Sequence, residues 1–100
     1  MAEHTAEFGL PADEPSAKGH FPGNPIVPGA VLLREIVRIV SAGSDAICRE
    51  IRSARFLHPV RPGDRLAIVW EEKVPCEINF TCSTGDAERV VVGVLSMRAR

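Results

Sequence analysis

The 100-residue sequence has no long apolar run and no block of like charges. Its apolar runs fall far short of the roughly 20 residues that cross a bilayer. The first ten residues, MAEHTAEFGL, carry acids and no basic stretch, unlike a signal peptide. The formal net charge of −1 at pH 7 disfavours a nucleic-acid tail or a membrane-surface helix. We therefore expect no nucleic-acid partner, no membrane association and a cytoplasmic location.

Cysteine and histidine are sparse. Cys48, Cys76 and Cys82 are widely spaced and contain no Cys-x-x-Cys pair, and the three histidines are not set at metal-ligand spacing. A disulfide framework and a bound metal are both disfavoured. We expect the three cysteines to be small core residues, and the protein to use no cofactor.

The composition is that of one small folded domain. Hydrophobic residues make up 45% of the chain and charged residues 25%, enough for one core and too little for two. No repeat, low-complexity tract or linker divides residues 1–100. Five of the eight prolines and three of the eight glycines fall within residues 11–29, which predicts a long loop there.

A helix is predicted over residues 30–42, because large apolar residues fill one broad arc at 100° per residue. Pro28 and Gly29 mark its start, and Gly43 is a plausible C-cap. Arg34 and Arg38 lie on the opposite arc. The apolar residues of the arc are Leu32, Leu33, Ile36, Val37, Ile39 and Val40.

Strands are predicted on both sides of this helix. Residues 4–10 form a short candidate strand, and alternating patterns rich in β-branched residues predict four antiparallel strands at 46–57, 65–73, 77–83 and 89–100. Pro62 and Gly63 suit a type II turn, whereas Pro75 should mark a bulge, a strand end or an exposed edge. The pattern favours an α+β domain with the helix packed on a curved sheet. One face or edge of such a sheet stays uncovered, which favours dimerisation through a sheet edge.

The loop before the helix carries the most informative residue. His20 begins the stretch HFPGNPIVPG, which leads directly into the helix at Gly29. A helix start offers free N–H groups and the positive end of the helix dipole, which can hold a developing oxyanion. A histidine nearby could act as a general base. The alternative is a loop histidine satisfied by backbone hydrogen bonds.

The same stretch resembles a known family. GHFPGNPIVPGAVLL, residues 19–33, is similar to the signature loop and central helix of the 3-hydroxyacyl-acyl-carrier-protein dehydratases, the hot-dog-fold thioester dehydratases of fatty-acid synthesis. Residues 51–68, IRSARFLHPVRPGDRLAI, resemble the strand, turn and strand that follow, and residues 90–100 resemble the last strand. The resemblance covers roughly residues 4–100. It implies a hot-dog fold, in which an antiparallel sheet wraps around one central helix.

The resemblance also implies roles for individual residues. His20 matches the catalytic base, and the backbone N–H of Gly29 matches the donor to the thioester carbonyl. The substrate would be a 3-hydroxyacyl thioester of acyl-carrier protein or coenzyme A, which loses water to give the 2-enoyl thioester. Each site of the family is built at a dimer interface, so a homodimer or hetero-oligomer is expected. Candidates for lining an acyl tunnel, each equally well explained as core, are Phe21, Ile26, Val27 and Val31.

The chain departs from the family in two places. From the resemblance, we expect it to lack the helix and first strand that these enzymes usually carry at the N-terminus. The family's acidic residue lies fourteen positions after the motif histidine, where this chain has Arg34. Arginine can bind an anion or polarise a hydroxyl, but it does not readily donate a proton. The nearest acid is Glu35, so Glu35 or a bound water would have to supply the proton.

Three functions remain open. The expected one is a dehydratase-like enzyme in fatty-acid or related acyl-chain biosynthesis. The second is a hot-dog acyl thioesterase, in which His20 activates water and Gly29 holds the oxyanion, without need of an acid at Arg34. The third is a non-catalytic partner subunit of a complete dehydratase. A shared fold does not separate these functions.

Overall fold

The computed structural model describes residues 3–10, 26–86 and 88–99. The elements in chain order are β1 (Glu3–Gly9), α1 (Gly29–Ala42), β2 (Ala46–Phe56), β3 (Arg65–Val74), β4 (Glu77–Thr84) and β5 (Arg89–Ala99). The strands form one five-stranded sheet in the order β1-β3-β4-β5-β2, and each neighbouring pair is antiparallel. The α+β prediction is confirmed. Within the described ranges, no helix has the length and apolar character needed to cross a membrane.

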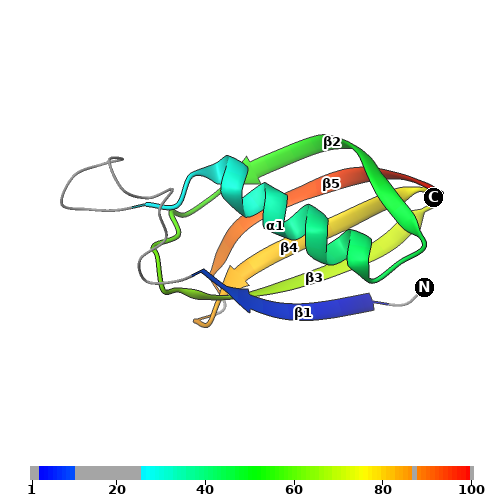
Figure 1. Cartoon of the computed structure of the whole chain (residues 1–100). Coiled ribbons are helices and arrows are strands. Elements are labelled where there is room, and N and C mark those ends of the chain that lie inside the picture. The colour runs from blue at the N-terminus through cyan, green and yellow to red at the C-terminus, as the bar shows by residue number, and fades with distance from the viewer. Residues whose placement is uncertain (1–2, 11–25, 87, 100) are drawn as a thin grey trace.

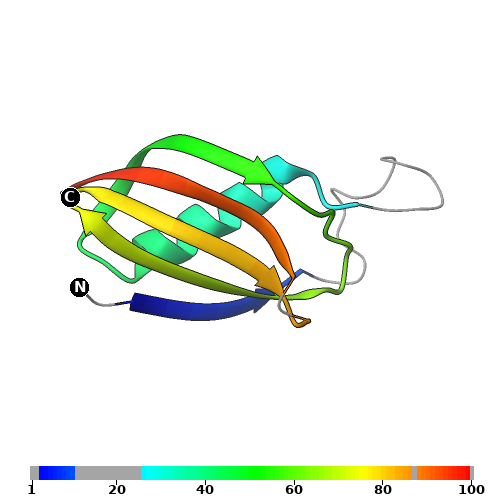
Figure 2. The ribbon, with the colours of Figure 1, turned by 180° about the vertical axis from the view of Figure 1, so that it is seen from behind.

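The helix lies across one face of the sheet (Figure 1), and the view from behind shows the opposite sheet face with no described helix over it (Figure 2). Leu32, Ile36 and Val40 are buried at four-residue spacing, which places them on one side of α1. They pack into a core with inward-facing residues of β3, β4 and β5, among them Ile68, Phe80, Cys82, Val91 and Leu95. Burial of this apolar stripe fixes the helix on the sheet.

The turn between β2 and β3 has the predicted geometry. Gly63 has a φ of 91°, which the third residue of a type II turn requires and which glycine adopts without strain. The Asp64 N–H donates to the Arg61 carbonyl at 3.1 Å, and the Arg61 N–H donates to Asp64 Oδ2 at 2.9 Å. β3 ends at Val74, directly before Pro75, so Pro75 marks a strand end.

The cysteines do not share one environment. Cys82 is buried, and burial raises the pKa of its thiol to about 11. Cys48 is half-buried, and its pKa is raised by burial and by the charge of Glu50. Cys76 is exposed in the turn between β3 and β4, where its φ is 67°. The expectation of a core position is confirmed for Cys82 and wrong for Cys76, because the turn carries Cys76 outside the core.

The sheet has two free edges among the described strands, β1 on one side and β2 on the other. β2 pairs with β5, and its register shifts between Cys48 and Glu50 and again between Ile51 and Ser53. Large apolar side chains are exposed along β2 and just after it: Ile51 is 42% exposed, Phe56 47% and Leu57 37%. An edge with both unpaired backbone groups and apolar side chains is suited to pairing with another chain.

Candidate active site at the start of α1

The first turn of α1 presents free backbone donors. Pro28 occupies the N-cap position with φ −59° and ψ 143°, and no side chain caps the helix. The N–H groups of Val31 and Leu32 both donate to the Pro28 carbonyl, at 3.0 and 3.3 Å. In the part of the chain that the structure describes, the Gly29 N–H has no acceptor. The positive end of the helix dipole adds to its attraction for an anionic oxygen.

The ring of Phe56 covers Gly29. A β-carbon on residue 29 would lie 2.7 Å from Cζ of Phe56 and 2.9 Å from Cε1, shorter than any normal contact. Only glycine therefore allows this approach without moving the ring. The contact joins the end of β2 to the first turn of α1.

A cavity of about 420 Å³ opens at this end of the helix. The segment before the helix is tied to the far wall of the cavity by the Val27 N–H, which donates to the Val60 carbonyl at 2.8 Å. The lining is mainly apolar and comes from the segment before the helix, from α1 itself and from the segment after β2: Ile26, Val27, Gly29, Leu32, Phe56, Leu57, His58, Pro59 and Val60. A helix start without a described acceptor, beside a mainly apolar pocket, suits a ligand with one polar carbonyl and an apolar chain.

Several residues singled out from the sequence meet in this cavity. Gly29, Val27 and Ile26 line it, and Val27 is also 3% exposed and part of the core. Val31 packs against the core without lining the cavity. His20 and Phe21 lie outside the described residues.

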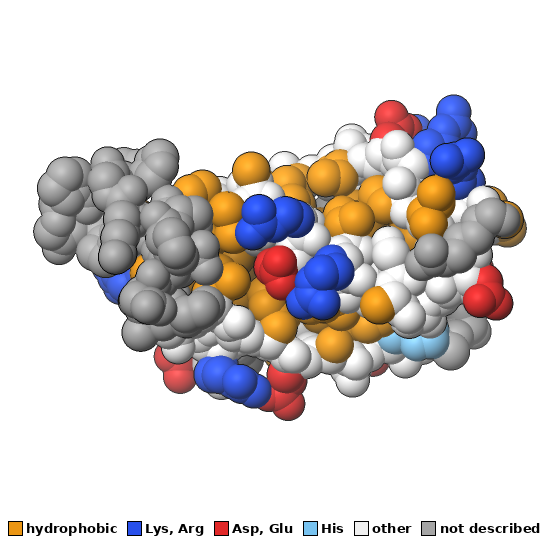
Figure 3. Space-filling model, viewed as in Figure 1, with side chains coloured by type: hydrophobic (Ala, Val, Ile, Leu, Met, Phe, Trp, Pro, Cys, Tyr) orange, Lys and Arg blue, Asp and Glu red, His pale blue; other side chains and the backbone are white. Residues whose placement is uncertain are grey.

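Arg34 and Glu35 lie on the outward face of α1 rather than in the cavity. Arg38 Nη2 donates to Glu35 Oε1 at 2.8 Å, and its Nε donates to the same oxygen at 3.3 Å. Arg34 Nε lies 3.8 Å from Glu35 Oε2. The arginine side chains are 69% and 65% exposed, that of Glu35 20%. Figure 3 shows basic and acidic side chains gathered over α1 among hydrophobic ones.

His58 is a cavity residue that the sequence reasoning did not single out. It lies in the segment after β2, and its Nδ1 is 3.6 Å from Glu88 Oε1. The sequence feature that could have identified His58 was its position within residues 51–68, the second stretch that resembles the family, directly before Pro59.

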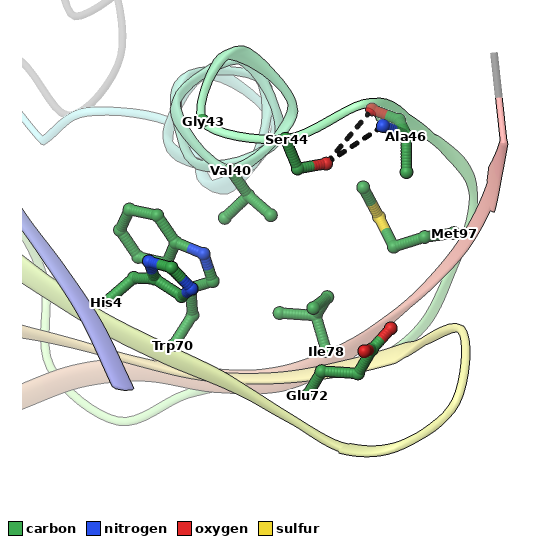
Figure 4. Close-up of a pocket in the computed structure, with 9 residues that line it drawn as sticks. All are labelled: His4, Val40, Gly43, Ser44, Ala46, Trp70, Glu72, Ile78 and Met97. Carbon is green, nitrogen blue, oxygen red and sulfur yellow. Dashed lines mark hydrogen bonds between the residues drawn. The ribbon is translucent and has the colours of Figure 1, made fainter. Parts of the chain in front are cut away.

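A second cavity, of about 290 Å³, lies at the other end of α1 (Figure 4). His4 stacks on Trp70 there, with ring centroids 5.5 Å apart and an interplanar angle of 20°. Ser44 Oγ accepts the Ala46 N–H at 2.9 Å. The remaining lining residues are Val40, Gly43, Glu72, Ile78 and Met97. This cavity contains none of the residues predicted to act in catalysis.

The chain is similar in sequence to known dehydratases. The family model described as ApeI-like, ApeI dehydratase, matches residues 1–94. The 3-hydroxyacyl-[acyl-carrier-protein] dehydratase FabZ of Chloroflexus aggregans is 39% identical over 66 residues, 57% of this chain and 46% of the relative. That of Caulobacter vibrioides is 38% identical over 63 residues, 52% of this chain and 40% of the relative. The matches thus span less than half of these relatives' length.

A longer match is the bifunctional enzyme LpxC/FabZ of Chlorobaculum tepidum, 35% identical over 97 residues, which cover 87% of this chain and 20% of that protein. Among solved structures, the dehydratase heterocomplex ApeI:P from Xenorhabdus doucetiae superposes with a TM-score of 0.79 at 20% identity, over 98% of this chain and 88% of the other. The (R)-hydratase from A. caviae superposes with a TM-score of 0.74 at 17% identity, over 99% of this chain and 95% of the other. The architecture is therefore the hot-dog fold.

Proposed function

Because this chain belongs to the ApeI-like dehydratase family, we propose that it removes water from 3-hydroxyacyl thioesters of acyl-carrier protein to give 2-enoyl thioesters. The reaction would serve fatty-acid or related acyl-chain biosynthesis. The observation that carries the proposal is Gly29 at the helix start, which lines a mainly apolar cavity of about 420 Å³ and whose N–H has no acceptor among the described residues. This combination suits a thioester carbonyl with an acyl chain behind it.

The family motif suggests two of the three chemical roles, and the position of Gly29 in the cavity supports one of them. His20, nine residues before Gly29, takes the proton from C2, a task suited to imidazole because its ordinary pKa lies near neutrality. The Gly29 N–H donates to the thioester oxygen as negative charge develops there. Val27 and Phe21 contribute apolar surface for the acyl chain. Phe56 closes the cavity over Gly29.

The third role is protonation of the leaving hydroxyl. The candidates from the sequence are Glu35 and a bound water, with Arg34 able to bind or polarise the hydroxyl. Glu35 is held on both sides by arginines, at 2.8 Å from Arg38 and 3.8 Å from Arg34. Its carboxylate reaches a substrate only if a second subunit brings a cavity to the outward face of α1.

A second subunit is therefore part of the proposal. The free edge of β2, with exposed Ile51 and Phe56, provides a surface for pairing with an identical or related chain. Phe56 lies both on this edge and over Gly29, so pairing there would enclose the start of α1. A homodimer or a hetero-oligomer satisfies this requirement equally.

A partner-subunit role is the second candidate, favoured by two observations. Arg34 occupies the position of the family's acid and is 69% exposed. A fold relative is described as part of a dehydratase heterocomplex. In such an assembly this chain would supply His20 and Gly29, or structure alone, and its partner would supply the acid. A thioesterase using the same oxyanion donor is the third alternative, and an acyl-CoA hydrolase from Staphylococcus aureus shares the fold at a TM-score of 0.70.

One experiment separates these candidates. The purified chain is incubated with 3-hydroxyoctanoyl and octanoyl pantetheine thioesters, and enoyl product and free thiol are measured separately. Enoyl formation without thiol release supports the dehydratase. Thiol release from both substrates supports the thioesterase. Absence of both activities contradicts an enzyme acting alone and favours the partner subunit.

A further inference from the structure

His58 lies on a segment that is anchored at both ends. On one side, the Leu57 N–H donates to the Val90 carbonyl of β5 at 2.8 Å. On the other, the Val60 carbonyl accepts the Val27 N–H from the segment before α1, also at 2.8 Å. These two bonds hold His58 between the sheet and the start of the helix. A side chain on such a braced segment is better positioned than one on a free loop.

His58 also stands apart chemically from its neighbours in the cavity. Among the described residues that line the Gly29 cavity, it alone has an ionisable side chain. The side chain is 49% exposed, so it is half covered while remaining in contact with solvent. A proton donor needs both features, because it must reach the substrate and then regain its proton from water.

Glu88 lies beside the imidazole of His58. Its Oε1 is 3.6 Å from His58 Nδ1, and its own backbone is fixed by the Thr84 N–H, which donates to the Glu88 carbonyl at 2.9 Å. The carboxylate faces Nδ1 across this distance, which suits Glu88 to position the ring. The other ring nitrogen, Nε2, is then left for the substrate.

We propose that His58 protonates the leaving 3-hydroxyl group, with Glu88 as its positioning residue; this inference rests on the dehydratase function proposed above. His20 removes the C2 proton, and that electron pair forms the C2=C3 double bond as the C3–O bond breaks. The departing oxygen takes a proton from His58 and leaves as water. His58 then regains a proton from solvent and His20 returns one, so the cycle closes without another reactant.

This assignment supplies the proton donor from the same chain as Gly29. It explains how Arg34 can replace the family's acid without loss of the reaction, since arginine does not readily donate a proton. It also leaves Glu35 in its ion pairs with Arg38 and Arg34 on the outward face of α1.

The test uses two substrates that differ only in the leaving group, 3-hydroxyoctanoyl and 3-chlorooctanoyl pantetheine thioester. Chloride leaves without protonation, so its elimination needs the base and oxyanion donor but no proton donor. His58→Gln should slow water elimination by roughly 10²–10⁴-fold in kcat, with chloride elimination within a few-fold of the parent. Glu88→Gln should give a smaller loss with the same selectivity. His4→Gln is the matched control, because His4 lies at the far end of α1, and it should leave both rates unchanged.

Three outcomes overturn the inference. Equal loss of both reactions in His58→Gln would show a structural role, and unchanged water elimination would show that another group donates. A selective loss in Glu35→Gln instead would assign the donor to the helix. If the parent eliminates neither group, the proposed function fails together with this inference, whereas in the first three cases the dehydratase stands.

Discussion

The ring of Phe56 lies so close to Gly29 that a β-carbon on residue 29 would approach Cζ of Phe56 to 2.7 Å. This contact links the end of β2 to the residue whose N–H is proposed to bind the thioester oxygen. Phe56 is nevertheless 47% exposed, so its ring has room to swing outward. The start of the helix and the end of the strand are thus coupled through one movable side chain.

Gly29→Ala should therefore disturb activity more than stability. The added methyl group displaces the Phe56 ring, and we expect the free energy of unfolding to fall by less than about 1 kcal/mol because the ring end is free to move. Enoyl formation should fall at least several-fold, since the cavity wall shifts. Adding Phe56→Leu should recover part of the rate. Denaturant titration and the enoyl assay check both effects, and an unchanged rate in Gly29→Ala would contradict a role for this contact.

His20→Ala should abolish enoyl formation and leave thermal unfolding unchanged, because the sequence predicts a loop at this position, where a histidine contributes little to the core. The measurement compares activity per folded molecule with the melting temperature. His4→Ala serves as control, since its imidazole stacks on Trp70 in the other cavity. A collapsed melting temperature with retained activity per folded molecule would show that His20 is structural.

Ile51→Lys should weaken association of the subunits. Ile51 is 42% exposed on the free edge strand β2, and a charge there discourages edge-to-edge pairing. Light scattering should show an oligomer for the parent and a shift toward monomer for the variant, with a parallel loss of activity. Val74→Lys, at the exposed end of β3, is the control. A parent that is monomeric at high concentration would contradict a site shared between subunits.

Stability should fall in alkaline solution because of Cys82. Burial raises the pKa of this thiol from 9.0 to about 11, so the folded state keeps the proton while the unfolded chain releases it. The free energy of unfolding should then decrease as pH rises from about 9 to about 11. Cys82→Val should flatten this slope, whereas replacing the exposed Cys76 by serine should leave it. Denaturant titrations at several pH values measure how the free energy of unfolding changes with pH. If Cys82→Val shows the same slope as the parent, a group other than Cys82 causes the effect.

The elements of this fold were readable from the sequence because each has a strong local signal. The helix was predicted from its apolar arc and observed at Gly29–Ala42, and the strand at 65–73 was observed at Arg65–Val74. Pro75 was predicted at a bulge, a strand end or an exposed edge because proline has a fixed φ and no N–H. Gly63 was predicted in a turn because glycine adopts a positive φ without strain. The exposed position of Cys76 was missed because composition does not show whether a small apolar residue lies in a strand or a turn.

The candidate site was only partly predictable. Gly29 and Val27 were found because they adjoin the helix start, where a local argument suffices. The contact between Phe56 and Gly29 and the pairing of His58 with Glu88 join segments far apart in sequence, so they depend on sheet register and loop path. The ion pairs of Glu35 with Arg38 and Arg34 follow from helix spacing, but their position away from the cavity required the fold.

Arg34→Glu tests the family's acid position directly. Arg34 is 69% exposed, and the substitution removes only its 3.8 Å ion pair with Glu35. Arg38 still binds Glu35 at 2.8 Å, so the fold should survive. If the proton donor acts from this position, a carboxyl group here should raise the rate of enoyl formation, whereas with His58 as the donor the rate should stay unchanged. General acid catalysis contributes roughly 10²–10⁴-fold, so partial recovery is measurable. Arg34→Gln, which removes the cation without adding an acid, is the matched control.

The same variant distinguishes the three functions. In a thioesterase, a carboxylate near the thioester should leave hydrolysis flat or lower it, because like charges oppose formation of the oxyanion. If the chain is a partner subunit, the purified chain alone should form neither enoyl product nor free thiol, whichever residue occupies position 34. Robust enoyl formation that neither Arg34→Glu nor Glu35→Gln alters would contradict a role for the outward face of α1. The donor would then have to lie inside the Gly29 cavity, where the His58→Gln comparison locates it.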